Sequence, residues 1–352
     1  MTEASKTRGR KKVTLASVEF DKVTMTMGFE HRGRVILETF GGSEVYFVKL
    51  PNTDDEWSSG ALSPETVRLS LTRPCALDDG SVYALVSSQG QRRRIVSVDL
   101  DTATFTDVAQ PAEWQSELKD LLAFRGSAIA IGAWADRAQH GYDGVVLATG
   151  ERLAVPRENP QRPAYEIQVY PFAGAAKASL VIADGAAYVW KGDTIERVQL
   201  QSSVRCFDFG QRDRSITLDD GRLLLCCGDS ADSGTHATAY RSYTIRWFDT
   251  DGRTGVFDPS IEYAVCGWAG PDGAMIVHRP EKSTEHLFSI VWTKERVVAD
   301  VPRAWARFRK FAHDVVYSPT ARALVCLQLK KTGARVTAIP WREIEALPRR
   351  AL

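Results

Sequence analysis

The stretch Ile216-Thr217-Leu218-Asp219-Asp220-Gly221-Arg222-Leu223-Leu224-Leu225 holds an apolar strand, a tight turn and a second apolar strand in ten residues. Asp-Gly between two apolar runs is a strong hairpin signal, because such turn residues must accept positive φ angles. The pattern returns in three further strong copies and three weaker ones, at residues 74–86, 180–190, 267–277, 29–37, 122–131 and 315–325.

The copies recur along the whole chain at a regular distance. With the turns placed at residues 33, 80, 126, 185, 221, 273 and 321, the mean spacing is 48 residues. This spacing leaves room for two more strands after each hairpin. Third strands are expected at residues 45–50, 95–100, 144–148, 194–198, 243–248, 287–292 and 335–339, and shorter fourth strands at 105–108, 152–155, 255–258 and 296–299. Four-stranded units repeated radially are typical of a β-propeller.

We therefore predict an all-β chain that forms a single β-propeller of seven four-stranded blades over residues 13–352. The alternating segment 13–20 is expected to complete the last blade against the segment near Trp341, which removes both sheet edges. Residues 1–12 form a basic, disordered tail in this interpretation. Two short helices are expected at residues 113–122 and 341–347. Six or eight blades, or two β-sandwiches, are the alternatives.

The segments 95–102, Ile-Val-Ser-Val-Asp-Leu-Asp-Thr, and 247–252, Trp-Phe-Asp-Thr-Asp-Gly, resemble the third strand and following turn of WD40-like and YVTN-like propellers. The resemblance covers most of the chain and implies the propeller fold. The resemblance does not imply an activity, because propellers with many different functions share this architecture.

Composition narrows the class of protein further. The 352 residues include 45 Lys and Arg against 44 Asp and Glu, so the net charge is +1. Such a balance argues against a protein held to nucleic acid or membrane by its overall field. The sequence shows no apolar run long enough for a transmembrane helix and no secretory signal pattern, which favours a cytosolic protein. The six cysteines form no metal-binding spacing and are expected to be reduced.

Loops between second and third strands lie on one face of a propeller, around the mouth of its channel. Four of them are long or charged here, at residues 87–94, 134–143, 229–241 and 279–286. Arg, Trp, Tyr and His on one rim favour a protein-binding surface, since these residues supply much of the energy of protein interfaces. The predicted partner-binding residues are Arg92, Arg93, Arg94, Trp134, Asp136, Arg137, His140, Tyr142, Asp232, His236, Tyr240, Arg241, Arg279 and His286.

The leading hypothesis is a non-catalytic propeller that binds another protein as a scaffold, regulator or inhibitory subunit, with no cofactor and no catalytic residues. One alternative is a metal-assisted, lactonase-like hydrolase whose ion is held by the loop histidines and carboxylates. A second is a nucleic-acid-binding propeller that uses the cations of residues 6–12 and the mixed aromatic and cationic segment 303–311.

Overall fold

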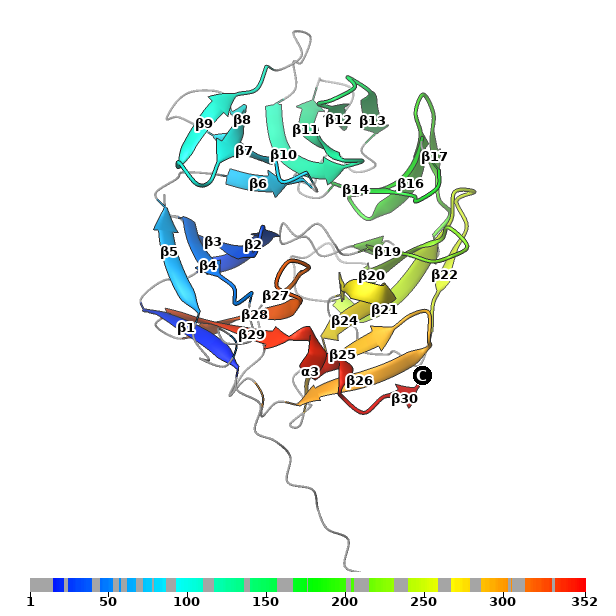
Figure 1. Ribbon diagram of the computed structural model, residues 1–352. Helices are drawn as coiled ribbons and strands as arrows, with labels where there is room; N and C mark the ends of the chain where they lie inside the picture. The colour runs from blue at the N-terminus through cyan, green and yellow to red at the C-terminus, as the bar shows by residue number, and fades with distance from the viewer. Residues whose placement is uncertain are drawn as a thin grey trace, which may run out of the picture.

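The computed structural model describes most of the chain. The described residues are 15–21, 25–39, 45–52, 57, 62–67, 72–77, 79–86, 93–109, 117–135, 140–156, 167–175, 177–200, 204–205, 215–230, 240–258, 267–278, 286–302, 305, 314–330 and 333–352. Seven antiparallel sheets stand around a common centre in this structure (Figure 1). The predicted seven-bladed β-propeller is therefore confirmed. No helix among these residues is long and apolar enough to cross a membrane. The predicted tail, residues 1–12, lies outside the described part of the chain.

The first four blades each contain four consecutive strands. Blade 1 holds β2 (Met25–His31), β3 (Arg34–Thr39), β4 (Val45–Lys49) and β5 (Ser63–Val67). Blade 2 holds β6 (Thr72–Ala76), β7 (Val82–Val86), β8 (Arg94–Asp99) and β9 (Thr104–Asp107). Blade 3 holds β10 (Glu117–Phe124), β11 (Ser127–Ala135), β12 (His140–Val146) and β13 (Arg152–Pro156). Blade 4 holds β14 (Ile167–Pro171), β15 (Ala178–Ala183), β16 (Ala186–Lys191) and β17 (Ile195–Arg197).

The last three blades add variations to this plan. Blade 5 holds β20 (Leu223–Ser230), β21 (Tyr240–Phe248) and β22 (Thr254–Val256), and both β18 (Val204–Arg205) and β19 (Ser215–Thr217) pair with β20. Blade 6 holds β23 (Gly267–Ala269), β24 (Ala274–His278), β25 (His286–Trp292) and β26 (Val297–Pro302), with the short 3-10 helix η1 (Pro271–Gly273) after β23. Blade 7 holds β27 (Asp314–Ser318), β28 (Ala323–Lys330), β29 (Gly333–Pro340) and β1 (Ala16–Asp21).

The first strand of each blade faces the centre of the ring. Strand β2 contacts β6 on one side and β27 on the other, β10 contacts β6 and β14, and β23 contacts β19 and β27. Middle strands lie between two neighbouring blades, so the apolar runs of β15 and β16 are buried along nearly their whole length. Outer strands face solvent, and all four residues of β9 are exposed.

The core consists of layers between blades. The buried apolar residues of the described chain form seven clusters, and each combines side chains from two adjacent blades. Trp292 of blade 6, for example, packs near Trp341 at the end of blade 7, with 6.4 Å between their ring centroids. Since burial of apolar area is the dominant stabilising contribution, each blade depends on both neighbours.

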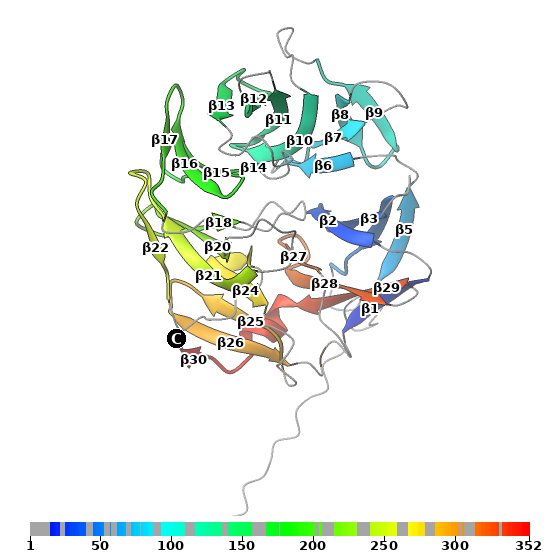
Figure 2. The same cartoon turned by 180° about the vertical axis from the view of Figure 1, so that it is seen from behind.

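The two chain ends are built into neighbouring blades. Strand β1 pairs antiparallel with β29, from Ala16 opposite Ala338 to Asp21 opposite Gly333, so the N-terminal strand closes the last blade as predicted. The predicted C-terminal helix is present as α3 (Trp341–Glu345). Beyond it, β30 (Arg350–Ala351) pairs with β26 and adds an outer strand to blade 6. Figures 1 and 2 show β1 beside β29, and β30 with the C-terminus beside β26.

One predicted turn belongs to a different hairpin from the other six. Asp184-Gly185 connects β15 to β16, which are the second and third strands of blade 4, whereas the other predicted turns connect first to second strands. The corresponding turn of blade 4 contains Gly174, at φ 78°, between β14 and β15. Gly174 lies 48 residues after Gly126 and 47 before Gly221, so the repeat is more regular than predicted. Residues 195–197, expected in a third strand, form the fourth.

The predicted helix at residues 113–122 is wrong where the structure describes it. Residues 117–124 form strand β10, the inner strand of blade 3. Its pairing with β11 shifts register between Leu118 and Asp120. The extra residue of this β-bulge brings Leu118 and Leu121, three apart in sequence, into one cluster. A spacing of three is also that of a helix face, which explains the error.

The described cysteines agree with the prediction of reduced thiols. Cys75, Cys227 and Cys326 are buried and form no disulfide. Cys226 and Cys227 are neighbours on the backbone of strand β20, and only the Cys227 side chain is described.

Candidate functional site

The two ends of the blades differ. We call the end with the connections from first to second and from third to fourth strands the turn face. The end with the connections from second to third strands and from blade to blade is the loop face. Counted between the strands that the structure describes, seven loop-face connections contain seven or more residues, but on the turn face only the β4–β5 and β29–β30 connections do. Long connections on a rigid frame are the usual place for recognition.

The predicted partner-binding residues come from this loop face, and the structure describes a minority of their side chains. Arg92, Asp136, Arg137, Asp232, His236 and Arg279 lie outside the described residues. Trp134, His140, Tyr240, Arg241 and His286 lie on strands whose backbone is described but whose side chains are not. The predicted loops 134–143 and 229–241 are shorter than expected, because β11, β12, β20 and β21 extend into them.

Arg94 begins strand β8 at the loop face, Arg93 directly precedes it, and the two side chains make different contacts. The Arg94 guanidinium donates to both carboxylate oxygens of Asp107 on β9, at 2.6 and 2.7 Å, and lies 5.6 Å from the ring centroid of Phe105. Phe105 is one of two large apolar side chains exposed among the described residues. Arg93 instead reaches across to blade 3, where it donates to the carbonyls of Leu118 and Lys119 at 3.4 Å. Arg94, Phe105 and Asp107 thus form an exposed patch on blade 2.

Tyr142 does not lie on the predicted surface. Its side chain is 2% exposed, and its hydroxyl donates a 2.6 Å hydrogen bond to Asp184 of blade 4. The β-strand alternation of β12 turns this ring into the layer between blades 3 and 4. Tyr142 therefore connects blades 3 and 4 from within the buried layer between them.

A cavity of about 210 Å³ lies on the turn face where blades 7, 1 and 2 meet. Sequence reasoning missed it, because its walls come from residues near 32, 50, 101 and 320 of the chain. The polar side chains that line it include His31, Arg32, Arg34, Lys49, Asn52 and Asp101. Arg34 donates to Asp101 of blade 2 at 2.5 Å, and this ion pair bridges the two blades. The cavity wall is therefore mainly cationic.

The backbone around this cavity is fixed by hydrogen bonds. The Leu50 N–H donates to the Gly33 carbonyl at 2.9 Å, which ties the end of β4 to the β2–β3 turn. The Glu30 carboxylate accepts from the Gly33 N–H at 2.7 Å and from the Ser318 hydroxyl of blade 7 at 3.0 Å. Blades 7 and 1 are thus joined directly beneath the turn that carries Arg32.

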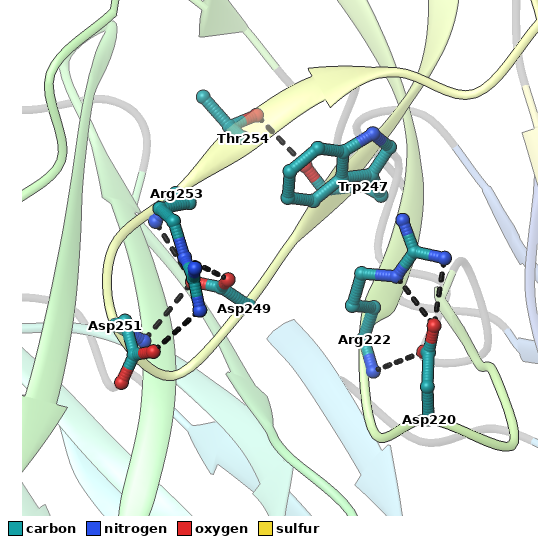
Figure 3. A network of polar contacts seen from close by, with 7 residues as sticks. All are labelled: Asp220, Arg222, Trp247, Asp249, Asp251, Arg253 and Thr254. Atoms are coloured by element: carbon teal, nitrogen blue, oxygen red, sulfur yellow. Dashed lines mark hydrogen bonds and ion pairs between the residues drawn. The ribbon is translucent and has the colours of Figure 1, made fainter.

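Charged side chains on the turn face of blade 5 pair with one another (Figure 3). Arg222 donates to Asp220 through Nε at 2.7 Å, and its guanidinium lies 5.0 Å from the Trp247 ring centroid. This hydrogen bond lowers the pKa of Asp220 and raises that of Arg222. In the next turn, Arg253 donates to Asp249 at 2.8 Å and to Asp251 at 2.6 Å. Each of the two arginines has a carboxylate partner, so this network fixes the shape of the two turns.

The described residues offer no group of three His, Cys, Asp or Glu side chains that could hold a metal ion. Among the loop histidines and carboxylates of the metal hypothesis, Asp143 alone has a described side chain. Neither a catalytic group nor a cofactor site follows from the described side chains.

No protein-family model and no curated protein matches this chain. Among solved structures, it resembles an acylaminoacyl peptidase in complex with Z-Gly-Gly-Phe-chloromethyl ketone, with 12% identity and a TM-score of 0.55 over 90% of this chain and 51% of the peptidase. The acylaminoacyl peptidase of Pyrococcus horikoshii has 12% identity and a TM-score of 0.53 over 88% and 51%. The β-propeller domain of the Trilobed protease from Pyrococcus furiosus has 12% identity and a TM-score of 0.51 over 90% and 95%.

This chain spans about half the length of the two acylaminoacyl peptidases. At such identities a structural likeness shows the fold alone, and no activity passes from these proteins to this one. What the comparisons establish is the architecture: the chain is a seven-bladed β-propeller.

Proposed function

We propose that this propeller binds another protein through its loop face and acts as a non-catalytic scaffold, regulator or inhibitory subunit of a cytosolic complex. The observation that carries the proposal is the difference between the two faces. Long connections gather on the loop face, while a closed ring of seven interlocked blades holds their ends in place. A rigid frame reduces the conformational entropy lost on binding. As part of the same proposal, we place the chain among the WD40-like and YVTN-like propellers.

The blade 2 patch lies on the outer edge of the ring, on β9 and at the loop-face end of β8, and gives the proposal a described contact point. Phe105 is 46% exposed and carries Arg94 beside its ring. An aromatic side chain next to an arginine is a common anchor at protein interfaces. The Asp107 carboxylate holds the guanidinium in one orientation, which reduces the entropy cost of a contact with a partner.

The test is affinity purification of the tagged full-length protein from its native host, followed by mass spectrometry. The blade 2 variant Phe105→Ala/Arg94→Gln should lose a stoichiometric protein partner that the wild type retains. The matched control is Arg253→Gln, which removes an exposed arginine from the turn face of blade 5. We expect the control to retain the partner, and both variants to melt within a few degrees of the wild type.

Two results would contradict the proposal. One is recovery of the same partner at the same stoichiometry with the blade 2 variant, which would show that the interface does not include Arg94 and Phe105. The other is a wild-type protein that elutes alone under gentle conditions and in low salt.

A further inference from the structure

The cationic cavity on the turn face lies on the opposite side of the ring from the proposed protein interface. It is formed by the β2–β3 turn, the end of β4, the β27–β28 turn and Asp101 of blade 2. A volume of about 210 Å³ is smaller than the roughly 300–1,000 Å³ of pockets that hold whole small molecules. Its ligand is therefore a single chemical group or a very small molecule.

Two cations of this cavity have no ion-pair partner among the described residues. Arg34 is engaged by Asp101, but neither Arg32 nor Lys49 lies within ion-pair distance of a described carboxylate. The Asp79 carboxylate of blade 2 interacts with Arg32 at longer range. The nearby Glu30 carboxylate accepts hydrogen bonds from the Gly33 N–H and the Ser318 hydroxyl, and it forms no ion pair with either cation. The Arg32 guanidinium lies against Gly80 of blade 2, where a Cβ would come within 2.6 Å of it. The guanidinium therefore packs against the main chain of blade 2, at a residue that has no side chain.

The equivalent arginines of blades 3 and 7 differ from Arg32, because each of them contacts a glutamate. Arg125 and Arg322 occupy the same kind of first-to-second turn as Arg32, and all three have φ between 45° and 49°. Arg125 contacts Glu151 at 3.4 Å and Ser179 at 3.0 Å. Arg322 contacts Glu345 at 3.8 Å. The turn arginine of blade 1 instead shares its cavity with Lys49 and Asn52, a cation and an amide.

We infer that the cavity between blades 7, 1 and 2 binds a single phosphate group through Arg32 and Lys49. A guanidinium and an ammonium both donate to phosphate oxygens, and the guanidinium can do so with two parallel hydrogen bonds. The Arg32 turn is held by hydrogen bonds from two blades, so the site is formed before the ligand arrives. Asn52 and His31 add polar side chains to the same wall.

The test is isothermal titration calorimetry of the full-length protein with inorganic phosphate in a low-salt buffer that contains no other polyvalent anion. We expect saturable binding of one phosphate per chain and a rise in melting temperature with phosphate concentration. The double variant Arg32→Asn/Lys49→Gln should bind at least tenfold more weakly. Asparagine is chosen because it tolerates the positive φ of residue 32. The matched control, Arg253→Gln on the same face, should bind as the wild type does.

Two further ligands identify the source of the group. Glycerol 3-phosphate that binds as tightly as inorganic phosphate shows that the cavity accepts a phosphate monoester, whereas weaker binding indicates free phosphate. Acetate carries a carboxylate and should bind more weakly than either. The inference is overturned if phosphate binding does not saturate, if the folded double variant binds phosphate as the wild type does, or if acetate binds at least as tightly.

Discussion

Single polar side chains at the blade junctions connect neighbouring blades of this ring. Tyr142 bonds Asp184, Ser318 bonds Glu30, and Arg34 bonds Asp101, and each contact joins two neighbouring blades. Their burial differs widely, so their energies do too. The Tyr142 side chain is 2% exposed, whereas the Asp101 side chain is 68% exposed and its ion pair is screened by solvent.

The Tyr142–Asp184 contact leads to the first prediction. Replacing Tyr142 by Phe removes the hydroxyl and leaves the Asp184 carboxylate without that donor, so the free energy of unfolding should fall by about 1–2 kcal/mol. Urea denaturation measures the change. Asparagine at residue 184 keeps the tolerance for φ 49°, so Tyr142→Phe, Asp184→Asn and the double variant form a cycle. A coupling energy near zero would show that the hydrogen bond does not hold the blades together.

Glu19 on the closing strand β1 leads to a prediction about pH. Lys330 contacts its carboxylate at 2.6 Å and Arg335 donates to it at 2.7 Å, and these contacts lower the pKa of Glu19 below its ordinary value of 4.5. Its contribution to stability is therefore complete above that value and disappears as the pH falls through the folded-state pKa. Glu19→Gln should cost less than about 1 kcal/mol at neutral pH, because the pair is exposed. Urea denaturation at several pH values should show this difference shrinking in acid; a difference that persists at low pH would contradict the prediction.

At the scale of strands, the turn signals of the sequence predicted blade number, strand order and ring closure. The turn signals assigned Asp184-Gly185 to the wrong hairpin of blade 4. This dipeptide fits any hairpin turn that needs a positive φ, so it does not identify the two strands that the turn connects. The β-bulge of β10 gave an apolar spacing of three that a helix would also give. The cationic cavity could not be predicted, because Arg32, Lys49 and Thr320 meet only once the ring has closed.

The pairing of β1 with β29 has a sharp test at Gly333. A Cβ on this residue would collide with the carbonyl oxygen of Phe20 on β1. Gly333→Ala should therefore lower the free energy of unfolding by about 1–3 kcal/mol, as forced overpacking does. The matched control is Gly270→Ala, whose Cβ would meet atoms only at 3.4 Å or beyond. Thermal or urea unfolding that affects both variants equally would show that β1 does not pack tightly against Gly333.

At the scale of the whole molecule, the last residues of the chain hold the outer edge of blade 6. Arg349 lies 4.1 Å from the Trp292 ring centroid and pairs with Glu295 at 2.6 Å, and the Leu352 N–H donates to the Arg296 carbonyl at 3.0 Å. Removing residues 348–352 should lower the free energy of unfolding by about 1–2 kcal/mol, mainly through loss of the cation–π contact and the β26–β30 pairing. Differential scanning calorimetry should still show one transition, because β1 keeps the ring closed. A second transition at lower temperature would indicate that blade 6 unfolds separately.

The closure of blade 7 also has a consequence for biosynthesis. A ribosome releases β1 before any of the seven blades, yet its partner β29 is made only after blades 1 to 6, and the Glu19–Arg335 contact spans 316 residues. Closing so long a loop is slow, and a strand without a partner exposes an edge on which other chains can assemble. Blades 1 to 6 can stack as they emerge, while β1 stays without its partner until β29 has been made. The nascent propeller is therefore an open arc while blades 1 to 6 are synthesised, and it becomes a ring only after blade 7 leaves the ribosome.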